Sequence, residues 1–374
     1  MKHNIVWVDF LRVLACFLVV LAHSTDPFVA QFNTNHNDFM TGVFWGSFYR
    51  PCVPLFAMIT GVLLLPIKMD MTTFYRKRLP RLVIPLFIWS IITPILFYLY
   101  LNSGIVSLNP NIDIASHSLS AAIAKSTSFI FNFNYATTPL WYLYMLIGIY
   151  LILPIISAWI AQAPKKDIQR VIWIWVLTTT LPYLQMVAPL LGYNGNYGNM
   201  GILGVCDWNP YGTFYYFSGF LGYVILANYL VRFPLNWSWR KTLSIAIPLW
   251  AMGYLITSLG FILTQKYYPG NFAQLEIIWL FTGINVLMMT FPFFIIIQKI
   301  SFKPSKFLSE LASLTFGVYL CHFLIVQICY DIVYPYIDIA PWLQLPLIAI
   351  FAFTVSSVII WILSRLPKSK YLIG

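Results

Sequence analysis

The chain has 374 residues, of which 60% are hydrophobic and only 9% are charged. So few charged side chains cannot cover a water-soluble protein of this length, and the composition therefore excludes a soluble globular protein. The net charge of +11 does not indicate nucleic-acid binding, because no segment forms the solvated basic domain that such binding needs.

Apolar segments recur along the whole chain, separated by short polar breaks or by breaks marked with Pro and Gly. Each is long enough to cross a bilayer as a helix, which takes about 20 residues. The predicted fold class is an all-α polytopic membrane protein, with residues 1–374 forming a single membrane domain and no appended soluble domain. We predict ten transmembrane helices, at residues 5–27, 39–66, 82–101, 138–161, 171–190, 208–229, 242–264, 272–298, 310–334 and 340–365.

The placement of Lys and Arg tests this count, because these residues collect in cytoplasmic loops. When the N-terminus is placed inside, all but four of the 22 Lys and Arg residues fall in inner segments. Of the four, Lys125 and Lys266 lie outside, and Arg12 and Arg50 lie within predicted helices. We therefore expect both termini in the cytoplasm.

The first predicted helix, 5–27, carries Asp9, Arg12 and His23 in an otherwise apolar setting. An ionisable group inside a bilayer is costly, so its presence indicates a functional site. Arg12 and His23 are eleven positions apart, which places them on nearly the same helix face and about 16 Å apart along the axis. Asp9 can share that side and partly neutralise Arg12. The helix would thus hold a permanent cation near the inner side and a titratable base near the outer side.

Two further basic features are open to more than one interpretation. Arg50 lies some eleven residues into the second predicted helix, so we expect it to face a protein-lined cavity with an anionic partner. Arg76, Arg78 and Arg81 lie at the entry to the third helix. Anchoring by positive charge on the inner side explains these three residues fully, whereas a phosphate clamp is the functional alternative because Arg forks suit phosphate groups.

Polar groups in later helices give less specific signals. His322 in the ninth predicted helix is either a substrate-contacting residue or a hydrogen-bonded structural histidine, and Asp331 lies half a turn off its face, so we expect no pair between them. Glu276, near the outer end of the eighth predicted helix, could orient an imidazole or accept a hydrogen bond from a sugar hydroxyl. The cysteines show no metal-ligand pairing and are expected to be small apolar packing residues; they are Cys16, Cys52, Cys206, Cys321 and Cys329.

Four groups of residues form an ordered pattern along the chain. They are Arg12 with His23; Arg50 with Val53, Pro54, Leu55, Phe56, Met58, Thr60 and Gly61; Arg76, Arg78 and Arg81 with Pro85; and Tyr319 with His322. As a set they resemble the acyltransferase-3 family of bacterial integral-membrane O-acyltransferases, and within it the branch of the enterobacterial common antigen O-acetyltransferase. The likeness covers nearly all of the chain.

The sequence departs from the family pattern at two positions. Thr60 stands where Ser is usual and keeps the hydroxyl. Pro139 stands where many relatives have His, so no role is assigned to that position.

The resemblance implies an enzyme of the bacterial inner membrane that transfers an acyl group from cytoplasmic acyl-CoA to a hydroxyl of an envelope polysaccharide or its lipid-linked precursor. We expect the acyl group to be acetyl. Arg12 with Arg76, Arg78 and Arg81 would hold the CoA phosphates, and His23 would be the general base. Arg50 or Tyr319 is the candidate for stabilising the oxyanion, and His322 and Glu276 are candidates for contacting the acceptor.

The co-substrate is then acyl-CoA, and we expect no bound cofactor, no metal and no nucleic acid. A transporter of glycans or small anions, without covalent chemistry, is the alternative. The sequence also leaves open a homo-oligomer, a succinyl or longer donor, and a histidine that carries the acyl group itself.

Overall fold

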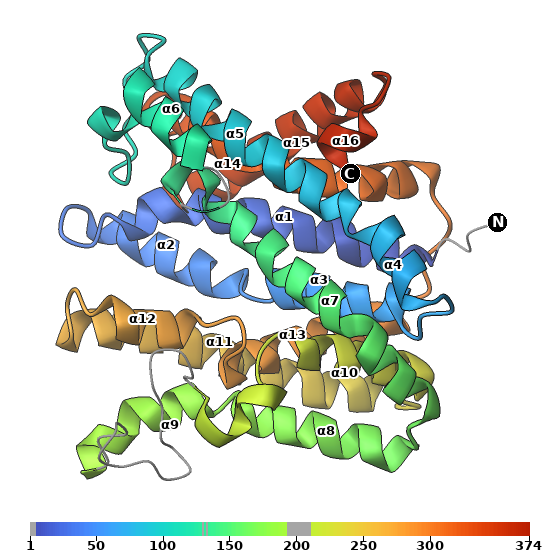
Figure 1. Cartoon of the computed structure of the whole chain (residues 1–374). Coiled ribbons are helices and arrows are strands. Elements are labelled where there is room, and N and C mark those ends of the chain that lie inside the picture. The colour runs from blue at the N-terminus through green and yellow to red at the C-terminus, as the bar shows by residue number, and fades with distance from the viewer. Residues whose placement is uncertain (1–4, 129–130, 132–133, 193–210) are drawn as a thin grey trace. The chain divides into compact units, whose positions relative to one another are not determined.

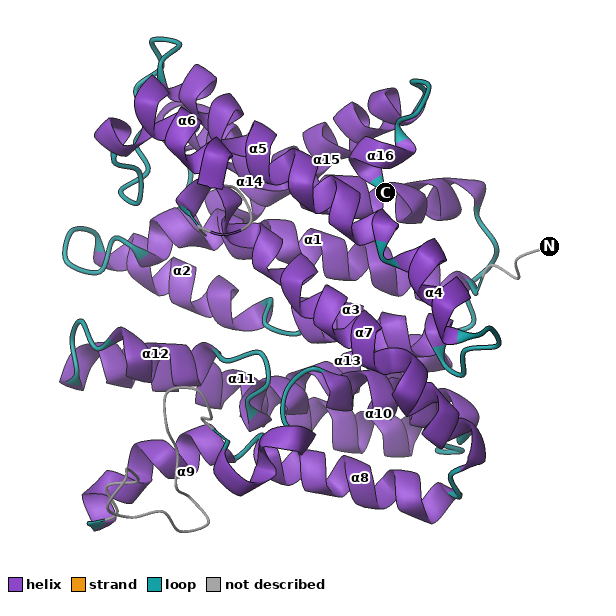
Figure 2. Ribbon diagram, in the orientation of Figure 1, coloured by secondary structure: helices purple, strands orange, loops and turns teal. Residues whose placement is uncertain are grey.

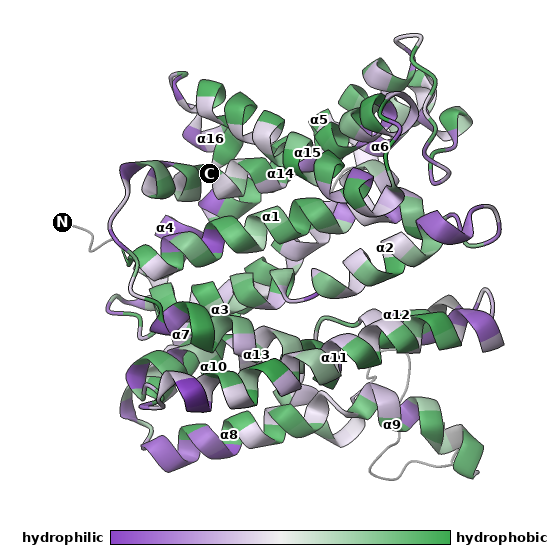
Figure 3. Cartoon of the chain, turned by 180° about the vertical axis from the view of Figure 1, so that it is seen from behind, coloured by the Kyte–Doolittle hydropathy of each residue, from purple (hydrophilic) through white to green (hydrophobic). Residues whose placement is uncertain are grey.

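The computed structural model describes residues 5–128, 131, 134–192 and 211–374, and over these residues the chain is helical and contains no β-strand (Figure 2). This confirms the predicted all-α class. The middle parts of the long helices are largely hydrophobic (Figure 3).

Within the described residues, eight helices are long and apolar enough to cross a membrane (Figure 1). Four of the spans are each formed by two helical pieces in succession. The eight are α1 (Val6–Val29), α2 with α3 (His36–Phe48 and Cys52–Leu64), α4 with α5 (Met71–Arg78 and Pro80–Leu101), η3 with α7 (Tyr135–Leu140 and Trp141–Gln162), α11 (Trp239–Tyr267), α12 with α13 (Phe272–Trp279 and Ile284–Lys299), α14 (Lys306–Tyr336) and α15 (Pro341–Ser364).

The predicted span 171–190 is not one continuous helix. Within this range α8 (Lys165–Thr178) ends, and α9 (Leu181–Val187) begins after a break of two residues. The hydroxyls of Thr178, Thr179 and Thr180 each donate to a carbonyl three residues earlier, at 2.6–2.7 Å. Such side-chain bonds compete with the helical ladder, and the following Pro182 has no amide to continue it.

The predicted span 208–229 also consists of shorter pieces. Residues 208–210 lie outside the described part of the chain, and η5 (Gly212–Phe217) precedes α10 (Leu221–Arg232). Gly219 has a φ of +85°, a left-handed conformation that breaks the helix and favours glycine. The remaining short elements are η1 (Ile114–His117), α6 (Leu119–Ser128), η4 (Ala188–Leu191) and α16 (Lys370–Ile373).

The chain divides into two compact units. The first comprises Met1–Tyr49, Met69–Pro154 and Phe302–Gly374, and the second comprises Arg50–Lys68 and Ile155–Ser301. In the first unit α1 packs against α2, α14 and α15, while α5 packs against α6, η3 and α16. In the second unit α11 packs against α12 and α13, and α10 packs against α3 and α8.

The cysteines of the described chain are free and buried, as expected for packing residues; they are Cys16, Cys52, Cys321 and Cys329. Cys206 lies outside the described residues.

Candidate active site

A single helix of the first unit carries both Arg12 and His23. α1 is helical without interruption from Val6 to Val29, so the eleven-residue spacing places the two side chains on nearly one face and about 16 Å apart along the axis. Arg12 Nη1 lies 3.8 Å from Asp9 Oδ1, which confirms the predicted pair. The Arg12 side chain is 34% exposed, so it stays accessible to another anion while it pairs with Asp9.

The basic residues of the third span approach Arg12 through a shared neighbour. Tyr150 of α7 lies within electrostatic range of Arg12, Arg78 and Arg81. The α4 helix is held on α7 at this point, because the hydroxyl of Tyr75 donates to the Leu151 carbonyl at 2.6 Å. Tyr150 is therefore a common electrostatic neighbour of three of the four predicted clamp residues.

The fourth predicted clamp residue, Arg76, is also on α4 and is exposed, but it is not among the charged neighbours of Tyr150. We therefore expect it to contribute less to any phosphate site than Arg78 and Arg81.

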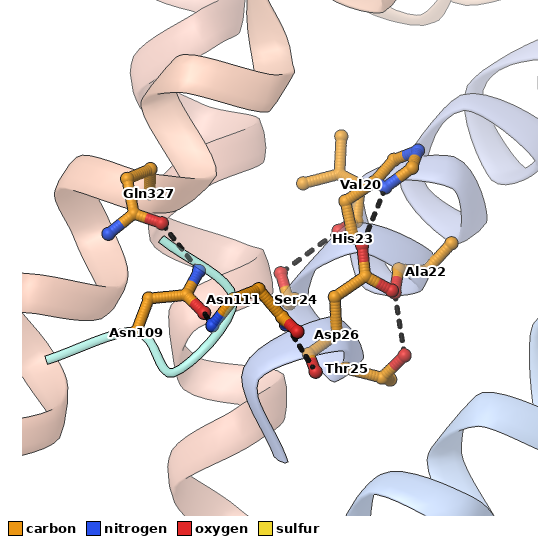
Figure 4. Close-up of polar contacts among 9 residues, drawn as sticks. All are labelled: Val20, Ala22, His23, Ser24, Thr25, Asp26, Asn109, Asn111 and Gln327. Carbon is orange, nitrogen blue, oxygen red and sulfur yellow. Dashed lines mark hydrogen bonds and ion pairs between the residues drawn. The ribbon is translucent and has the colours of Figure 1, made fainter. Parts of the chain in front are cut away.

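His23 is oriented by a carboxylate one turn later in the same helix. Its Nδ1 donates to Asp26 Oδ2 at 2.9 Å (Figure 4). Because an ionised carboxylate only accepts, this bond places the imidazole proton on Nδ1 and leaves a lone pair on Nε2. The His23 and Asp26 side chains are 17% and 39% exposed, so the pair is shielded but reachable. An imidazole held in this way is prepared to accept a proton from a hydroxyl.

Asp26 is not among the site residues predicted from the sequence. The signal for it is local, since an Asp three residues after a His lies on the same side of a helix.

A second imidazole lies beside His23. His322 of α14 is fully buried, and its ring centroid is 5.2 Å from that of His23. His322 Nδ1 donates to the Tyr319 carbonyl at 2.6 Å, which leaves the lone pair on Nε2. That nitrogen has no hydrogen-bond partner among the residues that the structure describes. An orphaned buried acceptor costs roughly 1–3 kcal/mol, so His322 Nε2 is a suitable acceptor for a donor group on a bound substrate.

Tyr319, one of the two candidates for stabilising an oxyanion, is already engaged. Its hydroxyl donates to the backbone carbonyl of Pro139, and its ring packs edge-on against Tyr142. Stabilising an oxyanion would require the bond to Pro139 to break. Tyr319 therefore acts in this structure as a structural link between α14 and η3.

The expectation that His322 and Asp331 do not pair is consistent with the structure. His322 donates to the Tyr319 carbonyl, whereas the carboxylate of Asp331 accepts from residues of α5, of the segment after it and of α14 itself.

An aromatic side chain of α14 also packs against the His23 ring. Phe323 lies edge-on to His23 with ring centroids 5.0 Å apart, and it also contacts Tyr135 and Phe97. His117 of η1 packs at the far end of this group, with its ring centroid 5.8 Å from that of Phe97. Burial lowers the pKa of His117 and so favours its neutral form.

Arg50 and Glu276 belong to the second unit, so their predicted roles next to His23 stay predictions. Arg50 is buried, donates from Nη1 to the Trp279 carbonyl at 3.1 Å and lies 4.0 Å from the centroid of that residue's ring. The contact is a cation–π interaction, and Phe281 provides a second ring at 5.2 Å. Glu276 is exposed on α12.

Comparison with known proteins identifies the family of the chain. A family model described as an acyltransferase domain matches residues 5–362. Searches of curated proteins and of solved structures found no significant match.

Proposed function

The chain belongs to the acyltransferase-3 family, and from this premise we propose that it is a membrane O-acyltransferase. The donor is cytoplasmic acyl-CoA, with acetyl as the expected acyl group. The acceptor is a hydroxyl of a cell-envelope glycan or of its lipid-linked precursor at the other side of the bacterial inner membrane. Both termini then lie in the cytoplasm, and the branch of the enterobacterial common antigen O-acetyltransferase remains the predicted placement within the family.

The observation that carries this proposal is the His23–Asp26 pair on the same helix face as Arg12. CoA carries several phosphate charges and does not cross a bilayer, whereas the glycan hydroxyl faces outward. Arg12, Arg78 and Arg81 suit the CoA phosphates, because guanidinium groups bind phosphate through paired hydrogen bonds. The pantetheine arm is an extended chain whose length is comparable to the separation of about 16 Å between Arg12 and His23 along α1.

In the proposed reaction, His23 Nε2 removes the proton of the acceptor hydroxyl as its oxygen attacks the thioester carbonyl. The Asp26 carboxylate stabilises the imidazolium that forms. When the tetrahedral intermediate collapses, the carbon–sulfur bond breaks and the imidazolium returns its proton to the departing thiolate. The products are the O-acyl ester and the free thiol of CoA.

His322 has a complementary role in this scheme. Its Nε2 is a buried acceptor that lacks a partner among the described residues and belongs to the ring next to His23. A sugar presents several neighbouring hydroxyl groups, and one of them would donate to this nitrogen while another is deprotonated by His23. His322 would then help to select the hydroxyl that reacts.

Binding and turnover of acetyl-CoA by the purified protein in detergent test the proposal. Wild type should bind acetyl-CoA and slowly release free thiol, Arg12→Ala should lose binding, and His23→Ala should bind without release. Arg170→Ala is a suitable control, because Arg170 forms an exposed ion pair with Asp167 in the second unit. Wild type that is folded but neither binds nor cleaves acetyl-CoA, and is also inactive with succinyl-CoA, would contradict the proposal. Movement of an unmodified glycan or anion without thiol release would indicate the transporter instead.

A further inference from the structure

A buried carboxylate fastens the segment between α5 and η1 to α14. Asp331 is 5% exposed, and four donors converge on it. Its Oδ1 accepts from Ser107 Oγ at 3.2 Å and from the Leu108 amide at 2.9 Å. Its Oδ2 accepts from the Tyr100 hydroxyl at 3.0 Å and from Gln327 Nε2 at 2.6 Å. A carboxylate with four donors is well satisfied in a dry setting, so this anchor fixes the path of the segment.

From Gln327, which donates to this anchor, a series of hydrogen-bonded residues leads to the His23–Asp26 pair (Figure 4). Gln327 Oε1 accepts from Asn109 Nδ2 at 2.6 Å, and Asn109 Oδ1 accepts from the Asn111 amide at 2.9 Å. Asn111 Nδ2 then donates to the backbone carbonyl of Asp26 at 3.0 Å. The side chain of Asp26 holds the His23 ring. All of these residues belong to the first unit.

The last turn of α1 needs such support, because Pro27 lies within it. Proline has no amide, so the His23 carbonyl receives no ladder bond from that position. The carbonyl of Asp26 accepts the C-cap bond from the Ala30 amide at 3.2 Å, and Asn111 is a second donor to it. The bond from Asn111 is a contact from outside the helix that holds the residue on which the orientation of His23 depends.

We propose that Asn111 is a positioning residue for the His23–Asp26 pair, and that Asp331 acts on that pair through Asn111. Asn111 is exposed, so Asn111→Ala leaves no cavity in the core and mainly removes the contact with Asp26. The segment between α5 and η1 is then a part of the catalytic site that keeps Asp26 facing the imidazole. This inference rests on the proposed function for its activity readout and not for its structural readout.

A double-mutant cycle tests the proposal. In the purified full-length protein, Asn111→Ala should lower kcat for CoA release about fivefold with little change in KM for acetyl-CoA, because one neutral hydrogen bond is worth roughly 1 kcal/mol. Asp331→Asn should lower kcat by no more than this, because an amide oxygen cannot accept all four donors and the effect reaches the pair only through Asn111. In the Asn111→Ala background, Asp331→Asn should cause no further loss of kcat, whereas independent structural effects would add.

A matched control separates positioning from general destabilisation. Glu310→Gln alters another carboxylate of α14, which accepts from Trp361 Nε1 and Arg365 Nη2 at 2.9 Å and is not part of the series. This control should keep the unfolding temperature of the wild type and a kcat within about twofold of it, as expected for a residue without a link to the site. If Asp331→Asn fails to fold, Asn109→Ala cuts the same series and replaces it in the cycle.

Amide hydrogen exchange gives a readout that does not depend on turnover. Exchange in the peptide covering residues 24–30 should be faster in Asn111→Ala and in Asp331→Asn than in wild type, and unchanged in Glu310→Gln. Additive losses of kcat, or unchanged exchange in that peptide, would overturn the inference. If exchange responds as expected but wild type releases no CoA, the link to the last turn of α1 stands and the proposed enzymatic function fails.

Discussion

Replacing Asp26 with Asn removes the negative charge that faces the His23 ring and nearly preserves the size of the side chain. The carboxylate accepts from Nδ1 at 2.9 Å, and in the proposed reaction it stabilises the imidazolium. A hydrogen bond to a charged group contributes roughly 1.5–3 kcal/mol. Because the Asp26 side chain is 39% exposed, water weakens the interaction and the lower end, about 1.5 kcal/mol, applies. Asp26→Asn should therefore lower kcat about tenfold.

The assay is the steady-state release of free CoA thiol by the purified protein, with KM for acetyl-CoA and the unfolding temperature measured on the same samples. KM should stay within about twofold, because in the proposed reaction the donor phosphates bind at the Arg12 end. The unfolding temperature should change little, because a partly exposed pair contributes only about 0–1 kcal/mol to stability. Asp167→Asn is the matched control, since Asp167 has the same i,i+3 spacing to its partner Arg170 and is 43% exposed. Full kcat in Asp26→Asn together with an inactive His23→Ala would refute the role of Asp26.

Three other outcomes follow from the geometry. Arg78→Ala should raise KM for acetyl-CoA about tenfold and Arg76→Ala clearly less, because a lost charged hydrogen bond costs roughly 1.5 kcal/mol and Arg78, unlike Arg76, is a neighbour of Tyr150 together with Arg12; equal effects on KM would contradict this difference. Gly222→Ala should lower the unfolding temperature, because a new Cβ would lie 2.0 Å from an indole ring, whereas Gly148→Ala meets nothing within 4 Å and should be neutral. Burial lowers the pKa of His117, so wild type should lose thermal stability as pH falls below the ordinary histidine pKa of about 6.5, and His117→Phe should lose less.

The sequence predicts the first helix well because the relevant geometry is local. The face shared by Arg12 and His23 and the contact of Asp9 with Arg12 depend only on helix periodicity over a continuous stretch. Asp26 could have been found by the same rule. Asp26 lies within the predicted helix 5–27, but its position there does not by itself distinguish a partner of His23 from a residue that ends the span.

Contacts between distant parts of the chain were not predictable in this way. The approach of His322 to His23 depends on the packing of α14 against α1, and the hydroxyl of Tyr319 meets a carbonyl of the distant residue Pro139. Residue spacing within one helix contains no information about either contact. The positions of Arg50 and Glu276 relative to His23 also depend on how separate elements pack, and for these two residues the predictions stand untested.

The interrupted spans show where hydropathy alone is insufficient. The run 171–190 is apolar enough to be predicted as one helix, yet three consecutive threonines and Pro182 divide it. Hydropathy is averaged over a window. It does not show where side-chain hydroxyls compete for backbone carbonyls or where a proline lacks the backbone amide. The same applies to the run that contains Gly219.

Transfer of labelled acetyl groups is a direct test of the proposed O-acyltransferase activity. Inverted membrane vesicles containing the wild-type protein would receive acetyl-CoA labelled in the acetyl group, and label would be measured in the isolated envelope glycan and its lipid-linked precursor. The account predicts label that is released by mild base, as expected of an ester, and that is absent with His23→Ala at equal protein level. Labelling by His23→Ala equal to that by wild type would contradict the account.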